Sequence, residues 1–263
     1  MDIVEYNRNA WNLQSLEGCR WSTPFDDETI ERAKAGDWSV VLTPNKPVPE
    51  DWFPSFPRLE GVDVLALASG GGQQVPVMAA AGARVTSFDA SDVQLEKDVE
   101  TAARHGLEVM AEQGDMARLD RFEDGSFDLI FHPVSNVFAA DVLPVWKECA
   151  RVLRPGGRLL AGFMNPSFFL FDHQLAEETG ELKVIHSLPY SDLDSMDREL
   201  LSEQMEAQLS VEFSHSLEEQ IGGQCEAGLA VTGLFEDGWD EASCALHRWM
   251  PLFIATRSVK LPN

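Results

Sequence analysis

The stretch from Asp63 to Val75, DVLALASGGGQQV, constrains the fold more than any other part of the chain. Its residues 64–68 are all apolar, which is typical of a short strand that is buried on both faces. Three glycines follow at 70–72, and Val75 then opens a helical pattern that ends at Gly82. A strand, a glycine turn and a helix in this order bring the backbone close to a nucleotide-like ligand.

The glycine turn does not match the dinucleotide-binding pattern G-x-G-x-x-G. Gly70 and Gly72 fit that pattern, but Val75 stands where its third glycine belongs. A plain glycine-rich turn in a parallel-sheet protein is the alternative interpretation. Because a Cβ atom blocks the approach of a ligand to the backbone, we expect a side chain at Gly72 to compete with the ligand for one space.

Size and charge restrict the class of protein. A chain of 263 residues with 44% hydrophobic content is long enough for one α/β domain with an appendage, or for two small domains. Its net charge of −24 repels nucleic acids and anionic membrane surfaces, so we expect neither as a partner. No apolar run is as long as a membrane span, and the first residues do not resemble a signal peptide, so a cytoplasmic protein is expected. The oligomeric state, monomer or homodimer, stays open.

The middle of the chain alternates predicted strands with predicted helices. Such alternation predicts a parallel, doubly wound sheet of the α/β class, with ligands bound beyond the carboxyl ends of its strands. A helix over 216–228 and two closing strands complete a mostly parallel sheet of seven strands. The strands are expected at 64–68, 83–88, 107–112, 127–132, 158–164, 229–235 and 252–259, and the helices between them at 75–82, 91–105 and 141–153.

Two segments lie outside this alternation. Residues 1–58 are expected to form an accessory or cap segment, with a short helix at 6–11 and a second helix from Thr23-Pro24 to Gly36. The prolines between 38 and 57 exclude a regular helix there and predict an extended segment anchored by Trp52 and Phe53. Residues 59–263 form the main domain, interrupted after the fifth strand by an insertion at 165–215. We expect this insertion to act as a lid over the ligand; a surface ornament or a dimer contact is the alternative.

The residues at the predicted strand ends form an ordered set. They are Ser69 to Gly72, Asp89, Gly114-Asp115, His132 to Asn136, and Arg154 to Gly157 before the fifth strand. Over residues 60–165 this set resembles the class I S-adenosylmethionine-dependent methyltransferases, and most of all the methyltransferase type 11 group of small-molecule enzymes. The resemblance implies a Rossmann-like fold, S-adenosyl-L-methionine as cofactor, and in-line transfer of a methyl group to a small-molecule acceptor. A cofactor-binding protein without catalysis, or a nicotinamide-dependent oxidoreductase, is the alternative.

The resemblance also implies roles for single residues. Asp89 is expected to accept hydrogen bonds from both ribose hydroxyls, and Asp115 from the adenine amino group. Ala66 and Ala68 depart from the family, which usually has an acid and a glycine there, and we expect Tyr6, Trp11 or a water to compensate for the missing acid. The full cofactor-binding set that we expect is Tyr6, Trp11, Ser69, Gly70, Gly71, Gly72, Asp89, Ala90, Gln94, Gly114, Asp115, Met116 and His132.

The chemistry of methyl transfer requires alignment, exclusion of water and, for some acceptors, a base. His132 ends the fourth predicted strand and is the candidate general base or substrate contact, with a structural ring as the alternative. The residues expected to contact the acceptor are Asn136, Tyr190, His215 and Gln220, although hydrogen bonding at a helix start is the simpler role for the last two. The four cysteines, at 19, 149, 225 and 244, are far apart and form no C-x-x-C pair, so no metal site is expected.

Overall fold

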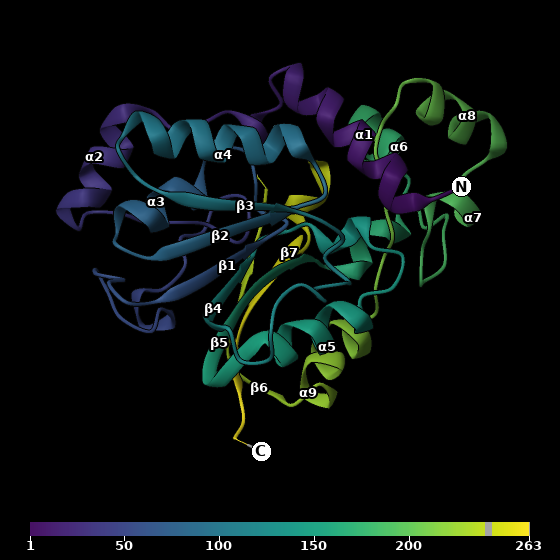
Figure 1. The fold of residues 1–263 in the computed structure, drawn as a ribbon. Coiled ribbons are helices and arrows are strands. Elements are labelled where there is room, and N and C mark those ends of the chain that lie inside the picture. The colour runs from purple at the N-terminus through teal and green to yellow at the C-terminus, as the bar shows by residue number, and fades with distance from the viewer. Residues whose placement is uncertain (240–243, 263) are drawn as a thin grey trace.

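The computed structural model describes residues 1–239 and 244–262, which fold around a seven-stranded sheet (Figure 1). The strands run in the order β3-β2-β1-β4-β5-β7-β6, and all neighbours pair in parallel except β7, which is antiparallel to β5 and β6. The predicted doubly wound, mostly parallel sheet is therefore confirmed. The strands are β1 (Asp63–Leu67), β2 (Arg84–Asp89), β3 (Val109–Gln113), β4 (Phe127–His132), β5 (Leu153–Met164), β6 (Leu229–Asp237) and β7 (Phe253–Lys260).

Helices cover both faces of the sheet. The helices α3 (Gln74–Ala80) and α4 (Asp92–Arg104) pack on one face, with α2 (Asp27–Ala35) beside α3. On the other face, α5 (Leu143–Val152) packs on β5 and α9 (Gly223–Glu226) packs on β6. Because side chains alternate along a strand, Val64 and Ala66 of β1 belong to the core beneath α3, and Leu65 and Leu67 to the core beneath α5.

Several predicted boundaries need correction. The helix predicted from Thr23-Pro24 begins instead at Asp27, because the carboxylate of Asp26 accepts the Thr29 backbone NH at 2.8 Å and caps it. Residues 20–22 form a short 3-10 helix, η1 (Arg20–Ser22). Strand β5 starts at Leu153, so Arg154 to Gly157 lie within the strand rather than before it. The predicted helix over 216–228 is divided into a π-helical turn, η5 (Glu218–Gly222), and α9.

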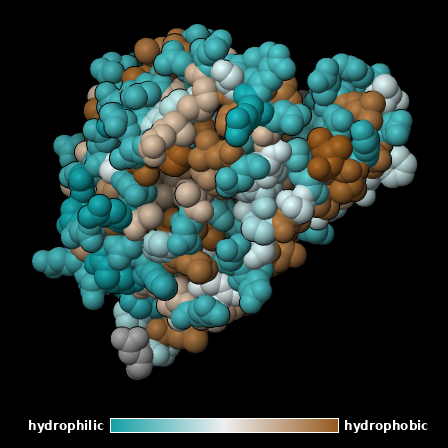
Figure 2. Space-filling model, turned by 90° about the vertical axis from the view of Figure 1, so that its right-hand side faces the viewer, coloured by the Kyte–Doolittle hydropathy of each residue, from teal (hydrophilic) through white to brown (hydrophobic). Residues whose placement is uncertain are grey.

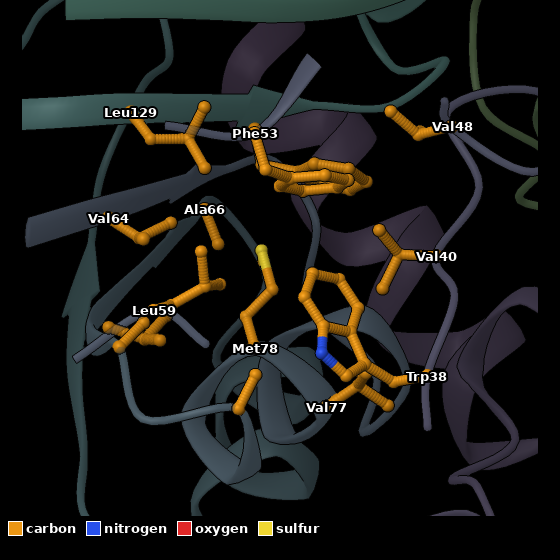
Figure 3. Close-up of a cluster of buried hydrophobic side chains, with 14 of the residues drawn as sticks. Trp38, Val40, Val48, Phe53, Leu59, Val64, Ala66, Val77, Met78 and Leu129 are labelled. Atoms are coloured by element: carbon orange, nitrogen blue, oxygen red, sulfur yellow. The ribbon is translucent and has the colours of Figure 1, made fainter. Parts of the chain in front are cut away.

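The proline-rich segment at 38–57 belongs to the main core rather than to a separate layer (Figure 3). Trp52, in the short helix η2 (Glu50–Trp52), and Phe53 are 5% and 4% exposed, which confirms them as anchors. Trp38 packs edge-on against Phe53 with ring centroids 4.9 Å apart. Figure 3 shows that Ala66 of β1 lies in the same cluster, among purely apolar side chains.

Two further segments gather at one end of the molecule, on the right of Figure 1. One is α1 (Ile3–Leu16), which contains the helix predicted at 6–11 and is longer than predicted. The other is the insertion at 165–215, called the lid segment below, which holds η4 (Pro166–Leu170), α6 (His173–Thr179), α7 (Asp192–Ser195) and α8 (Arg198–Glu206). Two more short helices, η3 (Asn136–Phe138) and η6 (Ala245–Arg248), follow β4 and β6. Among the described helices, none is long and apolar enough to cross a membrane.

The contact between the proline-rich segment and the sheet predicts a sensitive glycine. A Cβ atom added to Gly162 of β5 would lie 2.3 Å from the carbonyl oxygen of Leu42, so Gly162→Ala must displace the segment. We expect the free energy of unfolding to fall by about 1–3 kcal/mol, measured by urea denaturation. Gly222→Ala is the matched control, since its Cβ would find no atom nearer than 3.8 Å and its backbone is helical. Equal stability of the two variants would contradict this account of the packing.

Candidate functional site

A cavity of about 650 Å³ opens beyond the carboxyl ends of the parallel strands. Its floor is formed by the turns after β1, β2 and β3, and its other walls by α1, by residues 41–44 and by the lid segment. The end of the molecule that carries α1 and the lid segment faces the viewer in Figure 2, where hydrophobic side chains gather between hydrophilic ones. Most of the predicted cofactor-binding residues line the floor together: Ser69, Gly70, Asp89, Ala90, Gln94, Gly114, Asp115 and Met116.

The carboxylate of Asp89 joins two of the turns that form this floor. Its Oδ2 accepts the backbone NH of Gly70 at 3.2 Å, and its Oδ1 accepts that of Ser91 at 2.9 Å. Burial raises the pKa of Asp89 to about 6, against the effect of these backbone donors. Just before the turn, Ala68 has a φ of 48°, a value that favours glycine, which is the residue that the family resemblance implies for this place.

A second carboxylate, that of Asp98 in α4, also fixes the glycine turn, and the sequence analysis did not predict this role. Asp98 of α4 accepts the Gly72 backbone NH at 2.6 Å and the Ser87 hydroxyl at 2.7 Å, and it is 0% exposed. Burial raises its pKa to about 7. Its burial could have been predicted from the sequence, because Asp98 lies one turn after the apolar Leu95 on the core face of the helix.

Gly71 and Gly72 do not line the cavity. A Cβ atom at Gly72, where φ is 80°, would lie 2.8 Å from Cβ of Pro24 and 2.9 Å from Oγ1 of Thr101. The expectation that a side chain at Gly72 competes with the ligand is therefore wrong. It would compete with Pro24, because the glycine turn is covered on this side by the chain that follows η1.

The roof of the cavity is formed where α1 meets the lid segment. The side chain of Asn7 donates to the carbonyls of Phe138 and Val211, at 3.2 and 3.0 Å, and accepts the Val211 NH at 2.8 Å. The Tyr6 hydroxyl donates to the carbonyl of Leu209 at 2.9 Å. Tyr6 thus ties α1 to the lid and does not line the cavity, whereas Trp11 does line it.

The structure does not bring His132 into contact with the cavity. Its ring is fully buried against Trp146 of α5, with the ring centroids 6.0 Å apart, and its Nδ1 lies 2.9 Å from the carbonyl oxygen of Leu67. Burial lowers the pKa of His132 to about 4. The ring turns to the face of the sheet that α5 covers and does not line the cavity, although the hydroxyl of the cavity-lining Ser135 lies 3.4 Å from its Nδ1.

The four residues predicted to contact the acceptor also lie outside the cavity lining. The side-chain amides of Asn136 and Gln220 pair with each other, at 3.0 and 3.1 Å, and His215 Nε2 lies 3.1 Å from the Asn136 carbonyl. The Tyr190 hydroxyl donates to Asp192 at 2.8 Å. The contacts of Gln220 and His215 fasten the end of the lid segment and the chain after it to η3, and that of Tyr190 lies within the lid segment, so all four residues have structural roles.

Other polar groups do point to a ligand. Three buried polar atoms on cavity-lining residues, Ser69 Oγ, Trp11 Nε1 and Trp239 Nε1, have no hydrogen-bond partner within the described chain. Buried polar groups are normally paired, so these atoms fit a site whose ligand supplies the partners. Lining residues that the sequence analysis missed include Trp21, Thr43, Glu212 and Trp239. Within 1–239 and 244–262, no group of three or more acidic, histidine or cysteine side chains is placed to hold a metal.

Comparisons with known proteins agree with this geometry. The family model described as a methyltransferase domain matches residues 65–161. The uncharacterized methyltransferase YbaJ of Bacillus subtilis is 47% identical over 98% of this chain and 99% of its own length. A putative S-adenosylmethionine-dependent methyltransferase from Listeria monocytogenes has a similar fold, with a TM-score of 0.60, 14% identity and coverage of 81% of this chain and 95% of its own. A geranyl diphosphate methyltransferase, solved in complex with GPP and sinefungin, gives a TM-score of 0.54 at 18% identity, over 77% of this chain and 72% of its own.

The buried carboxylate below the glycine turn predicts a pH-dependent stability. The pKa of Asp98 is raised from 3.8 to about 7, so the folded state holds this proton more tightly than the unfolded state does. Its contribution to stability is fully present below about pH 4 and is lost as the pH rises through 7. We expect wild type to lose on the order of 2–4 kcal/mol relative to Asp98→Asn between pH 4 and pH 8, measured by urea denaturation at each pH.

The exposed Glu96→Gln on the same helix is the control for this comparison, and it should leave the pH dependence unchanged. Parallel stability curves for wild type and Asp98→Asn would show that Asp98 is ionised in both states, and would refute the assignment.

Proposed function

Since this chain belongs to the S-adenosylmethionine-dependent methyltransferases of the methyltransferase domain family, we propose that it methylates a small-molecule acceptor held inside the cavity. The observation that carries the proposal is that Gly70 of the glycine turn and Asp89 line one cavity whose walls carry mainly apolar side chains. One end of this cavity suits a nucleoside, and the rest is free for an acceptor. Its volume of about 650 Å³ lies in the usual range for small-molecule sites.

The residues on the floor would hold the cofactor. Asp89 is fixed by two backbone NH groups and keeps acceptor capacity for hydroxyl groups of a ribose. Asp115 is held in the same way by the Ala117 NH at 2.9 Å, beside Met116. The buried hydroxyl of Ser69, on the same floor, has no hydrogen-bond partner in the described chain. S-adenosyl-L-methionine, when bound, supplies a methyl group made reactive by a positively charged sulfur.

The rest of the cavity would orient the acceptor and exclude water. Side chains from α1, from residues 41–44 and from the lid segment enclose it, and their hydrogen bonds to one another fix the roof. In such an enclosure a nucleophile is kept aligned and poorly solvated, and both effects favour a displacement reaction. The net charge of −24 opposes a nucleic acid as acceptor.

A second candidate is a protein that binds the cofactor without catalysis. It is favoured by Ala66, which is 0% exposed and packs in an apolar cluster, so no carboxylate stands at that place (Figure 3). Binding of S-adenosylhomocysteine without turnover of radiolabelled S-adenosyl-L-methionine over a metabolite panel would favour this candidate. Turnover with any small molecule would favour the enzyme.

Asp89 tests the proposed cofactor site. Asp89→Ala removes a charged acceptor for two hydroxyls, at a cost of roughly 1.5–3 kcal/mol for each hydrogen bond lost. We therefore expect the dissociation constant for S-adenosylhomocysteine, measured by isothermal titration calorimetry, to rise at least tenfold. Asp89→Asn, which keeps one oxygen acceptor, should bind with intermediate affinity, and the exposed Glu96→Ala should bind as wild type does. If the dissociation constant is unchanged in a folded Asp89→Ala protein, the cofactor does not bind at Asp89.

The roof gives a second test of the proposed site. If α1 and the lid segment close over a bound ligand, S-adenosylhomocysteine should slow amide hydrogen exchange in residues 1–15 and 208–215, because opening of the roof then requires release of the ligand. Exchange in α9, on the far face of the sheet, should not change and serves as the internal reference. Protection of the glycine turn alone would show that the roof is not a lid.

A further inference from the structure

The end of the lid segment presents one carboxylate to the cavity. Val211 and Phe213 point into the protein, and their backbone NH groups donate to the side chain of Asn7 and to the carbonyl of Val137, each at 2.8 Å. Side chains alternate along an extended chain, so Ser210 and Glu212 point the opposite way, and both line the cavity. Glu212 is thus aimed into the cavity by a backbone that is held on both sides.

No described residue donates a hydrogen bond to the carboxylate of Glu212. Its backbone NH is bound by Asp192 at 2.8 Å, and Asp192 in turn accepts from Tyr190 and Gln204. Burial and, next, the charge of Asp192 raise the pKa of Glu212 to about 7. The titratable groups that interact with the Glu212 carboxyl are Asp192 and Tyr190 of the lid segment. The other charged side chains on the cavity lining are Arg8 of α1, which pairs with Glu5, and Asp89, Asp115 and Asp141.

We propose that Glu212 binds the ammonium group of the acceptor and accepts the proton that this nitrogen must lose before it reacts. The acceptor is then a primary or secondary amine with an apolar, ring-sized body. This inference rests on the proposed methyltransferase function, of which it names the substrate class and the proton acceptor.

The walls around Glu212 favour an apolar cation. Seven aromatic side chains line the cavity, and the faces of such rings attract cations as well as apolar groups: Trp11, Trp21, Phe88, Phe138, Phe168, Trp239 and Phe253. The ionisable lining is mainly acidic, with Asp89, Asp115, Asp141 and Glu212 against Arg8 within the described chain. A cavity of this kind concentrates cations and repels carboxylate or phosphate acceptors. An uncharged hydroxyl acceptor gains nothing from this field.

The proton transfer follows from the same placement. A protonated amine has no free electron pair and cannot attack a methyl group. When the N–H bond breaks, the proton bonds to a carboxylate oxygen of Glu212 and the electron pair stays on nitrogen. Removal from water lowers the pKa of the amine, and burial raises that of Glu212, so the two groups are brought closer in proton affinity.

Binding of simple amines tests the proposal without turnover. The probes are 2-phenylethylamine and tryptamine, with 2-phenylethanol and indole-3-ethanol as uncharged counterparts, titrated by calorimetry with and without saturating S-adenosylhomocysteine. In wild type we expect the amines to bind about tenfold more tightly at pH 8 than at pH 6, because the ionised fraction of Glu212 rises about tenfold across a pKa near 7. Glu212→Gln should weaken amine binding at pH 8 at least tenfold and remove the pH dependence, with no effect on the alcohols.

Three controls make the result decisive. Glu199→Gln, an exposed carboxylate on α8, should bind the amines as wild type does. Glu212→Asp should restore part of the affinity. Because Glu212→Gln removes a buried charge, it should melt no lower than wild type at pH 8, and a loss of binding is then not a loss of folding.

The outcomes separate the two proposals. Amines that bind equally to wild type and Glu212→Gln, or alcohols that bind as tightly as amines, overturn the inference about Glu212. The same holds if no amine binds. S-adenosylhomocysteine should bind equally to wild type and Glu212→Gln. If wild type fails to bind it, the proposed methyltransferase site is contradicted, and the titration without cofactor still decides the inference.

Discussion

The site depends on the hydrogen bonds that two carboxylates accept from the backbone of the glycine turn. Asp89 accepts the backbone NH of Gly70 and Asp98 accepts that of Gly72, so the turn is fixed from two elements of the structure, β2 and α4. The turn carries glycines because side chains there would meet Gln94, Pro24 and Thr101 rather than a ligand. The shape of the ligand floor is thus set by packing beneath it, and a chain with Ala66 and Ala68 in place of the usual residues keeps that shape.

The N-terminal residues take part in both the core and the site. The proline-rich segment packs against β1, β4 and β5 and supplies a wall of the cavity from residues 41–44, while α1 supplies its roof. Asn7 joins α1 to the loop after β4 and to the lid in one set of three hydrogen bonds. Segments that are about 200 residues apart therefore close the same cavity, and a disturbance of either one reaches the acceptor.

The sequence predicts the parts of this structure that local pattern controls. Strand ends carry Asp89 and Asp115 to the floor because the carboxyl ends of parallel strands share one edge, and the alternation of strands with helices determines that edge. The orientation of the His132 ring could not be predicted from local pattern, since it depends on whether the ring packs against Trp146 or points into the cavity. The pairing of Asn136 with Gln220 joins residues far apart in the chain, and no local pattern contains it. Glu212 was missed because only the anchoring of Val211 and Phe213 shows which way it points.

The raised pKa values also connect stability with function. Asp89, Asp98 and Glu212 all hold protons more tightly in the folded protein, so each contributes less to stability as the pH rises toward 7 and beyond. Asp89 and Asp98 face backbone NH groups, which partly compensate their charge from within the protein. Glu212 has no such donor in the described chain. A cation bound beside this carboxylate would offset the cost of its ionisation, which no group of the described chain offsets. The lack of a hydrogen-bond donor among the described residues, rather than a raised pKa, distinguishes Glu212 from Asp89 and Asp98 and supports the proposal that it binds a cation.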